Sequence, residues 1–206
     1  MNHAFLARVG QATLPRAFPI IGVFTLMSAL PPGAAADAAQ ATSQHHGLTS
    51  NQQGPASELV KVVREVTERF QDVEVAKREG YGLQFGCVSG GDYGAMGLHF
   101  VNLALVADPA LDPRRPEIVL YEPRPNGQLR LIGADFLVFK ADWDAAHPNE
   151  PPQIMGQLLH LFESPNRFGL PDFYTLHVWA WKDNPTGTFV NWHANVSCDA
   201  FNGQTP

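Results

Sequence analysis

The chain has 206 residues, of which 45% are hydrophobic, and its 14 Lys and Arg against 20 Asp and Glu give a formal net charge of −6 at pH 7. This acidic balance argues against nucleic acid and anionic membrane surfaces as partners, because both repel a negatively charged protein. The length and the hydrophobic content are sufficient for one folded domain with a core of its own.

The first 36 residues have the features of a secretory signal peptide. Two arginines precede an apolar run at residues 17–30, and the small residues that follow it fit cleavage before Asp37. An uncleaved anchor is the alternative, but the run is shorter than the about 20 apolar residues that span a bilayer. Cleavage removes the two arginines and no acids, which leaves 12 − 20 = −8 on the mature chain. We therefore expect a secreted or periplasmic protein, with no membrane as partner once the signal is removed.

The mature chain is predicted to consist of a leader followed by one domain. Residues 37–55 lack periodicity and are rich in Gln, Ser, Thr and Gly, which is typical of a flexible leader. A single globular domain is predicted for residues 56–206. It begins with a helix from Ser57 to Phe70, because apolar residues recur there at helical spacing. The apolar stripe consists of Leu59, Val62, Val63, Val66 and Phe70.

Strand patterns dominate the chain from Tyr81 onwards. Strands are predicted at residues 82–88, 95–106, 117–122, 129–140, 173–182 and 188–192. The "PNG" turn predicts that the third and fourth of these strands form a hairpin, and residues 154–163 have the spacing of a short helix. A helix followed by mostly antiparallel strands predicts an α+β fold, mostly β. The amphipathic helix is expected to pack on a sheet that closes as a small barrel or sandwich.

Cys87 and Cys198 are the two cysteines of the chain. In an exported protein such a pair is expected to form a disulfide. A bridge that closes a loop of this size contributes roughly 4–5 kcal/mol in the chain-entropy description. The alternative is that both thiolates bind a metal, but oxidation competes with metal binding outside the cytosol.

Four polar residues interrupt strand faces that are otherwise apolar: His99, Glu122, Asp135 and His177. Burying such a group without a partner costs a few kcal/mol, so four of them in a small core indicate a site. Two imidazoles and two carboxylates on neighbouring strands suit a divalent transition metal as cofactor. All four are predicted metal ligands, and Glu122 and Asp135 are also candidate catalytic bases. His160 and His193 are further histidines that could join the set.

Other interpretations of the same residues stay open. The set also suits a metal-free acid–base pair, in which a carboxylate raises the pKa of an imidazole. Alternatively, backbone carbonyls satisfy the histidines and Arg124 or Arg130 satisfies the carboxylates. The alternatives to a metal-dependent enzyme are a non-catalytic module that binds a small apolar ligand and a structural exported protein without a site. A small molecule is the partner that the sequence leaves open, and no oligomeric state is indicated.

Several motifs are similar to those of a family of small exported bacterial proteins. The segments that carry the resemblance are "GAMGLHFVN", "LYEP", "LRLIGADF", "LPDFYTLHVWAWKDNPTGTF" and the closing "VSC", which together cover most of the chain from about Tyr81 to Cys198. The resemblance implies export and one recurring set of residues, and it implies no reaction. This chain has Asp135 where the family pattern has Glu, and "NWHANVSC" where the pattern has W-N-P. The shorter carboxylate reduces the reach of the side chain by about one methylene.

Overall fold

The computed structural model describes residues 50–203, with side chains described from Ala56 onwards. The predicted signal peptide and most of the predicted leader lie outside the described residues. Helix α1 (Ser50–Thr67) begins before the predicted start at Ser57, so the last residues assigned to the leader belong to this helix. Within the described part of the chain, no helix is long and apolar enough to span a membrane.

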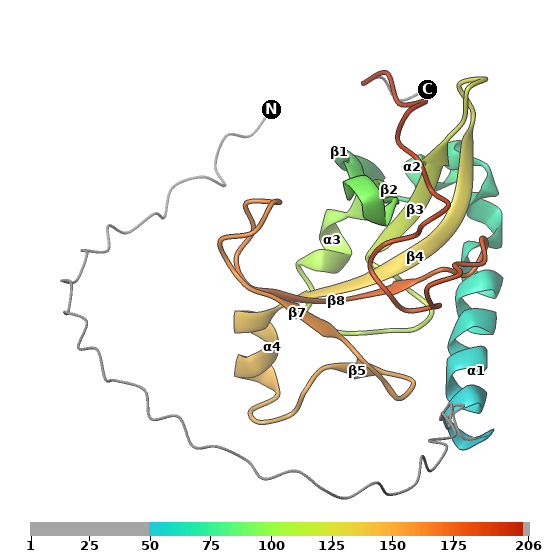
Figure 1. The fold of residues 1–206 in the computed structure, drawn as a ribbon. Helices are drawn as coiled ribbons and strands as arrows, with labels where there is room; N and C mark the ends of the chain where they lie inside the picture. Colours follow the sequence, from blue (N-terminus) through green and yellow to red (C-terminus); the bar gives the residue numbers. More distant parts are fainter. Residues whose placement is uncertain (1–49, 204–206) are drawn as a thin grey trace, which may run out of the picture. The chain divides into compact units, whose positions relative to one another are not determined.

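A six-stranded antiparallel sheet forms the body of the fold, with the strand order β1-β2-β3-β4-β8-β7 (Figure 1). Its strands are β1 (Tyr81–Ser89), β2 (Ala95–Asn102), β3 (Ile118–Pro123), β4 (Leu129–Phe139), β7 (His160–Phe162) and β8 (Phe173–Val178). A separate pair consists of β5 (Gln153–Ile154) and β6 (Gln157–Leu158). The shorter helical elements are η1 (Glu68–Gln71), α2 (Val73–Arg78), η2 (Gly91–Tyr93), α3 (Leu103–Val106) and α4 (Lys140–Ala146).

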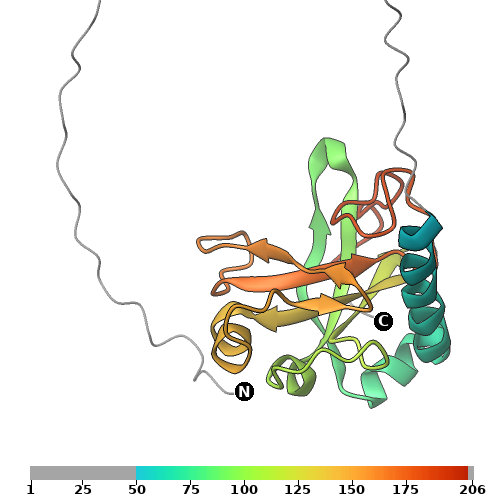
Figure 2. The ribbon, with the colours of Figure 1, turned by 90° about the horizontal axis from the view of Figure 1, so that it is seen from below.

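The predicted α+β class with a mostly antiparallel sheet is confirmed, whereas the predicted closure as a barrel is not found among residues 50–203. Strands β1 and β7 are the two edges of the sheet, and a barrel would require them to pair. In the described residues, β1 pairs with β2 and β7 pairs with β8, and the two edges do not pair with each other. Figure 2 shows the sheet open, with the β1–β2 hairpin projecting at one end.

Helix α1 lies alongside the sheet in both views and buries its apolar stripe there (Figures 1 and 2). Leu59 and Val63 pack against β4 and β8 in one cluster, as the 3.6-residue period predicts. Phe70 follows in η1 and packs beside Tyr81. The carbonyl oxygen of Phe70 accepts a hydrogen bond from the Tyr121 hydroxyl (2.7 Å). Val62 is only half-buried, so the stripe is narrower than predicted.

Several predicted elements differ from the structure. Residues 154–163 form β5, β6 and β7 instead of a short helix, because Met155 and Gly156 have φ angles of +46° and +80° and make a tight turn. Such angles end a helix, and only glycine adopts them readily. The predicted strand at 188–192 is not formed, and the strand from 95 stops at Asn102, whose side chain caps α3.

The C-terminal segment is attached to the first two strands of the sheet. Cys87 of β1 and Cys198 form the predicted disulfide, with their Cα atoms 5.7 Å apart. The backbone of His193 exchanges two hydrogen bonds with Ala95 at the start of β2. Together with the β7–β8 connection, this segment supplies apolar side chains to the cluster on the face opposite α1, through Val196 and Phe168.

Candidate metal centre

Pairing register brings three of the predicted polar residues onto the sheet face opposite α1. Asp135 on β4 pairs with His177 on β8, and His99 on β2 pairs with Leu120 of the intervening strand β3. Residues that pair across antiparallel strands point to the same face of the sheet. Ala134 and Phe136, the neighbours of Asp135 on β4, pack in the same hydrophobic cluster as the buried residues of α1. Asp135, between them, therefore points to the opposite face of the sheet.

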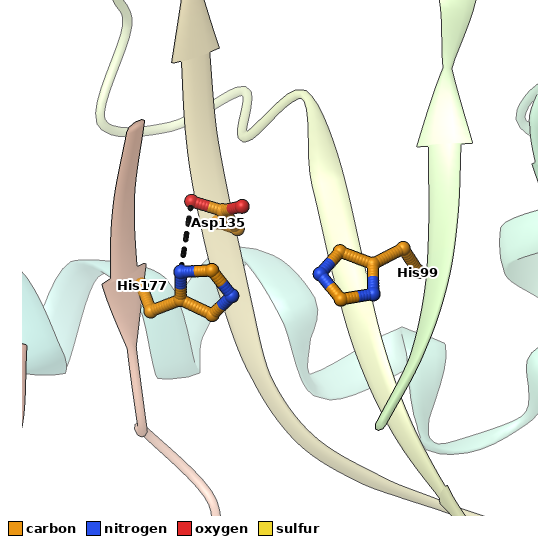
Figure 3. Close-up of side chains that lie close together, drawn as sticks. All are labelled: His99, Asp135 and His177. Atoms are coloured by element: carbon orange, nitrogen blue, oxygen red, sulfur yellow. Dashed lines mark ion pairs between the residues drawn. The ribbon is translucent and has the colours of Figure 1, made fainter. Parts of the chain in front are cut away.

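The three side chains converge at one point, as Figure 3 shows. One ligand atom from each of His99, Asp135 and His177 lies within 4.8 Å of the others. The ring centroids of the two histidines are 5.7 Å apart, and Nδ1 of His177 is 3.6 Å from Oδ1 of Asp135. All three residues are at most 4% exposed. The two predicted histidines therefore share one buried pocket.

Hydrogen bonds from neighbouring groups orient two of the three side chains. The Thr175 hydroxyl donates a hydrogen bond to Oδ1 of Asp135 (2.5 Å). Nδ1 of His99 lies 3.3 Å from the Gly97 carbonyl oxygen. A carbonyl can only accept, so this contact places the proton on Nδ1 and leaves Nε2 with its lone pair. Outer partners of this kind fix the orientation of metal ligands in proteins.

His177 is the exception to this satisfied network. Neither of its ring nitrogens has a hydrogen bond of normal length within the described part of the chain, although the side chain of Asn191 is near enough to raise the pKa of the ring. The 3.6 Å to Asp135 is longer than a hydrogen bond. Nearly all buried polar groups in proteins have a partner, and leaving one unpaired costs about 1–3 kcal/mol. A bound ion would supply the missing partner.

The electrostatics of the pocket keep the three groups in the forms that bind metals. Burial, together with the neighbouring His177, lowers the pKa of His99 to about 4. Burial likewise lowers the pKa of His177 to about 3. The pKa of Asp135 is raised by burial to about 6, against the hydrogen bond from Thr175. At pH 7 both imidazoles are therefore neutral and the carboxyl is mostly ionised, as coordination requires.

The spacing of the donors is close to that of a coordination sphere. Metal–ligand bonds of about 2.1 Å place neighbouring donors of a tetrahedral site about 3.4 Å apart. The Nδ1–Oδ1 distance of 3.6 Å is already near this value. The widest separation between two of the three ligand atoms is at most 4.8 Å. To reach the about 3.4 Å of a tetrahedral site it has to shorten by about 1.4 Å at most, which small side-chain rotations can provide. The residues present thus fit a small divalent cation.

The cavity beside these donors is small and mostly apolar, with a volume of about 20 Å³. This is room for about one water molecule or one ion. This cavity therefore has no room for an apolar ligand of several atoms. The cavity is lined by the three donors and by Thr175, Phe85, Met96, Ile118, Leu137, Phe162, Phe168, Leu170 and Phe173.

Glu122, predicted as a metal ligand and a catalytic base, is not part of this group of side chains. It lies near the end of β3, beyond Ile118, which pairs with Asp135, and Leu120, which pairs with His99. Two residues along a strand correspond to about 6.6 Å, which is beyond the reach of a shared ion. Its carboxylate instead accepts a hydrogen bond from Nζ of Lys182 (2.6 Å).

The two further histidines also lie outside the group. His160 is exposed on β7, and His193 is fully buried with its ring 4.9 Å from that of Trp179. Two functional neighbours were missed from the sequence. Thr175 shares the strand face of His177, a signal that alternation could have supplied. Glu117 is 2% exposed and accepts a hydrogen bond from the Leu137 amide (3.1 Å), which depends on how β3 and β4 pair.

The chain matches no family model, no curated protein and no solved structure. The interpretation of the site consequently depends on its own geometry and chemistry. The disulfide provides one independent indication, since such bonds persist in oxidising compartments such as the extracellular space or the periplasm.

Proposed function

We propose that the protein is an exported metalloprotein that binds one divalent transition-metal ion through His99, Asp135 and His177. The observation that carries this proposal is the convergence of three buried donors from three strands. Two histidines and one carboxylate form the donor set of many catalytic zinc and non-haem iron sites.

Three protein ligands leave coordination positions open, and this favours a metal-dependent enzyme over a purely structural metal site. An ion held here supplies a Lewis acid that polarises a bound oxygen or lowers the pKa of a bound water. Thr175 holds the carboxylate of Asp135 in place, and the Gly97 carbonyl holds the ring of His99. The apolar walls of the cavity limit access of bulk water to the ion.

Export and the absence of a nucleic-acid partner belong to the same proposal. Export is supported by the disulfide, by the signal-like first 36 residues and by the motif resemblance. The net charge of −6 supports a small molecule as the partner, since a nucleic-acid surface attracts basic proteins.

Titration with Co²⁺ tests the metal site directly. Protein freed of metal with a chelator should bind one Co²⁺ per chain, seen in the visible absorption spectrum and in metal analysis. His177→Ala should weaken binding at least about 100-fold, because loss of even an outer partner of a ligand costs about 10–100-fold. The matched control is His147→Ala, since that ring stacks on Trp143 (3.9 Å between centroids) away from the pocket.

Glu122→Gln provides a second control, and it should keep full binding because Glu122 pairs with Lys182. Equal cobalt affinity of the His177→Ala and His147→Ala variants would contradict the proposed site. If metal content is unaffected and a pH-dependent activity is lost instead, the metal-free acid–base interpretation is favoured.

A further inference from the structure

The cavity at the proposed metal centre approaches solvent along a rim of mainly aromatic side chains. Among the residues that line it, only Phe85 is exposed, with 48% of its surface accessible. Phe162, Phe168 and Leu170 are half-buried, and all the others are buried. A ligand on its way to the metal must therefore pass these rings.

Phe85 and Phe168 are in contact across this rim. Their rings meet edge to face, with centroids 5.4 Å apart. The ring of Phe168 is also 6.5 Å from that of His99, one of the proposed metal ligands. The pair thus extends from the protein surface to the donor atoms.

The two rings are held in different ways. The register between β1 and β2 skips Phe85 and Gly86, which lie in a bulge, and Phe85 has a φ of +63°, which is unfavourable for an aromatic residue. Phe168 lies in the β7–β8 connection, where the side chain of Asn166 accepts hydrogen bonds from the amides of Phe168 and Leu170. The backbone at Phe168 is therefore held by its own loop, and Phe85 is the ring with a solvent-exposed side.

The cavity of about 20 Å³ has room for about the ion alone, so a ligand of the ion must extend into the space at the rim beside the Phe85 and Phe168 rings. We propose that, in the metal centre proposed above, the Phe85–Phe168 pair restricts the ligands of the ion to molecules of roughly one or two non-hydrogen atoms. The substrate class is then a very small molecule, and Phe85 is a specificity-determining residue. This inference rests on the proposed metal site.

Cyanide and azide are suitable probes, because both are linear monoanions that bind Co²⁺ and azide is one atom longer. The Co²⁺-loaded full chain is titrated with each anion without air and at one pH, and binding is followed by the visible spectrum. Metal analysis after each titration establishes that cobalt is still bound. The variants are Phe85→Ala and Phe85→Gly, of which the second suits the positive φ. The control is Tyr93→Ala, an aromatic residue that is 71% exposed and does not line the cavity.

We expect both Phe85 variants to bind azide at least about ten-fold more tightly than the wild type, which corresponds to about 1.4 kcal/mol. Their affinities for cyanide and for Co²⁺ should match those of the wild type, and Tyr93→Ala should match it for all three. Equal azide affinity of wild type and Phe85 variants would overturn the proposal. If the wild type binds no Co²⁺ before any anion is added, the metal site itself is refuted, and this inference with it.

Discussion

Replacing both cysteines of the Cys87–Cys198 bridge with alanine should lower the free energy of unfolding by about 5 kcal/mol. The two cysteines are separated by 111 residues, so the bridge closes a loop that contains the strands from β2 to β8. In the chain-entropy description, a loop of this size lowers the entropy of the unfolded chain by about 16 cal/mol/K, which gives about 5 kcal/mol at 25 °C. The effect acts mainly on the unfolded chain, because the backbone hydrogen bonds between Ala95 and His193 still hold the C-terminal segment in the variant.

Equilibrium denaturation in guanidinium chloride measures this loss, with oxidised wild type compared with the Cys87→Ala/Cys198→Ala double variant. Changing both residues avoids a lone thiol that could pair between molecules. The dependence of the free energy on denaturant should become steeper in the variant, because its unfolded chain exposes more surface. A loss below about 1 kcal/mol would refute the reasoning. Two reactive thiols per chain in unreduced, denatured exported protein would show that the bridge is absent there.

Three further perturbations test the fold and the buried groups around the site. Phe70→Ala should cost about 3–5 kcal/mol in denaturation experiments, because the ring is 1% exposed in the core, and a loss below about 1 kcal/mol would show that η1 contributes little to the core. Burial raises the pKa of Glu117 to about 8 from an ordinary 4.5, so the folded state keeps a proton that the unfolded chain loses between these values, and the contribution of Glu117 to stability should fall as pH rises through that window. Because His99, His177 and Asp135 titrate there too, the fall is measured as a difference: the free energy of unfolding of the wild type minus that of Glu117→Gln should decrease with pH, and parallel curves would contradict the assignment. Gly97→Ala should lower the free energy of unfolding by at least about 2 kcal/mol, since φ is +87° and the new Cβ would lie 2.5 Å from the Tyr121 carbonyl oxygen. The same variant should weaken Co²⁺ binding, and wild-type stability would argue against this close approach.

Local pattern was sufficient to identify the main elements and three of the residues in the pocket. Helical spacing identified the buried residues Leu59 and Val63, and the two-residue alternation of strands marked His99, Asp135 and His177 as polar exceptions. These features are visible in the sequence because they depend on neighbours only a few positions apart. The cysteine pairing was also predictable, since an exported chain with two cysteines has one intramolecular pairing to make.

Local pattern misled where a short apolar run suits either a helix or a strand. Residues 154–163 have helical spacing, but the positive φ angles at Met155 and Gly156 turn the chain into the β5–β6 pair. The edge strand β7 then runs along β8, with His160 opposite Thr175. Periodicity over so few residues does not distinguish the two structures, and contacts with the rest of the sheet decide between them.

Only the tertiary structure decided which polar residues meet. Glu122 lies on a strand face of the same pattern as Asp135, yet the register of β3 places Ile118 opposite Asp135 and Leu120 opposite His99, and leaves Glu122 to Lys182. Alternation tells which face a residue occupies, and it carries no information on how far along the neighbouring strand that residue lies. Register is set by pairing between segments far apart in the chain, such as Asp135 with His177, and so the composition of the site follows from the folded sheet.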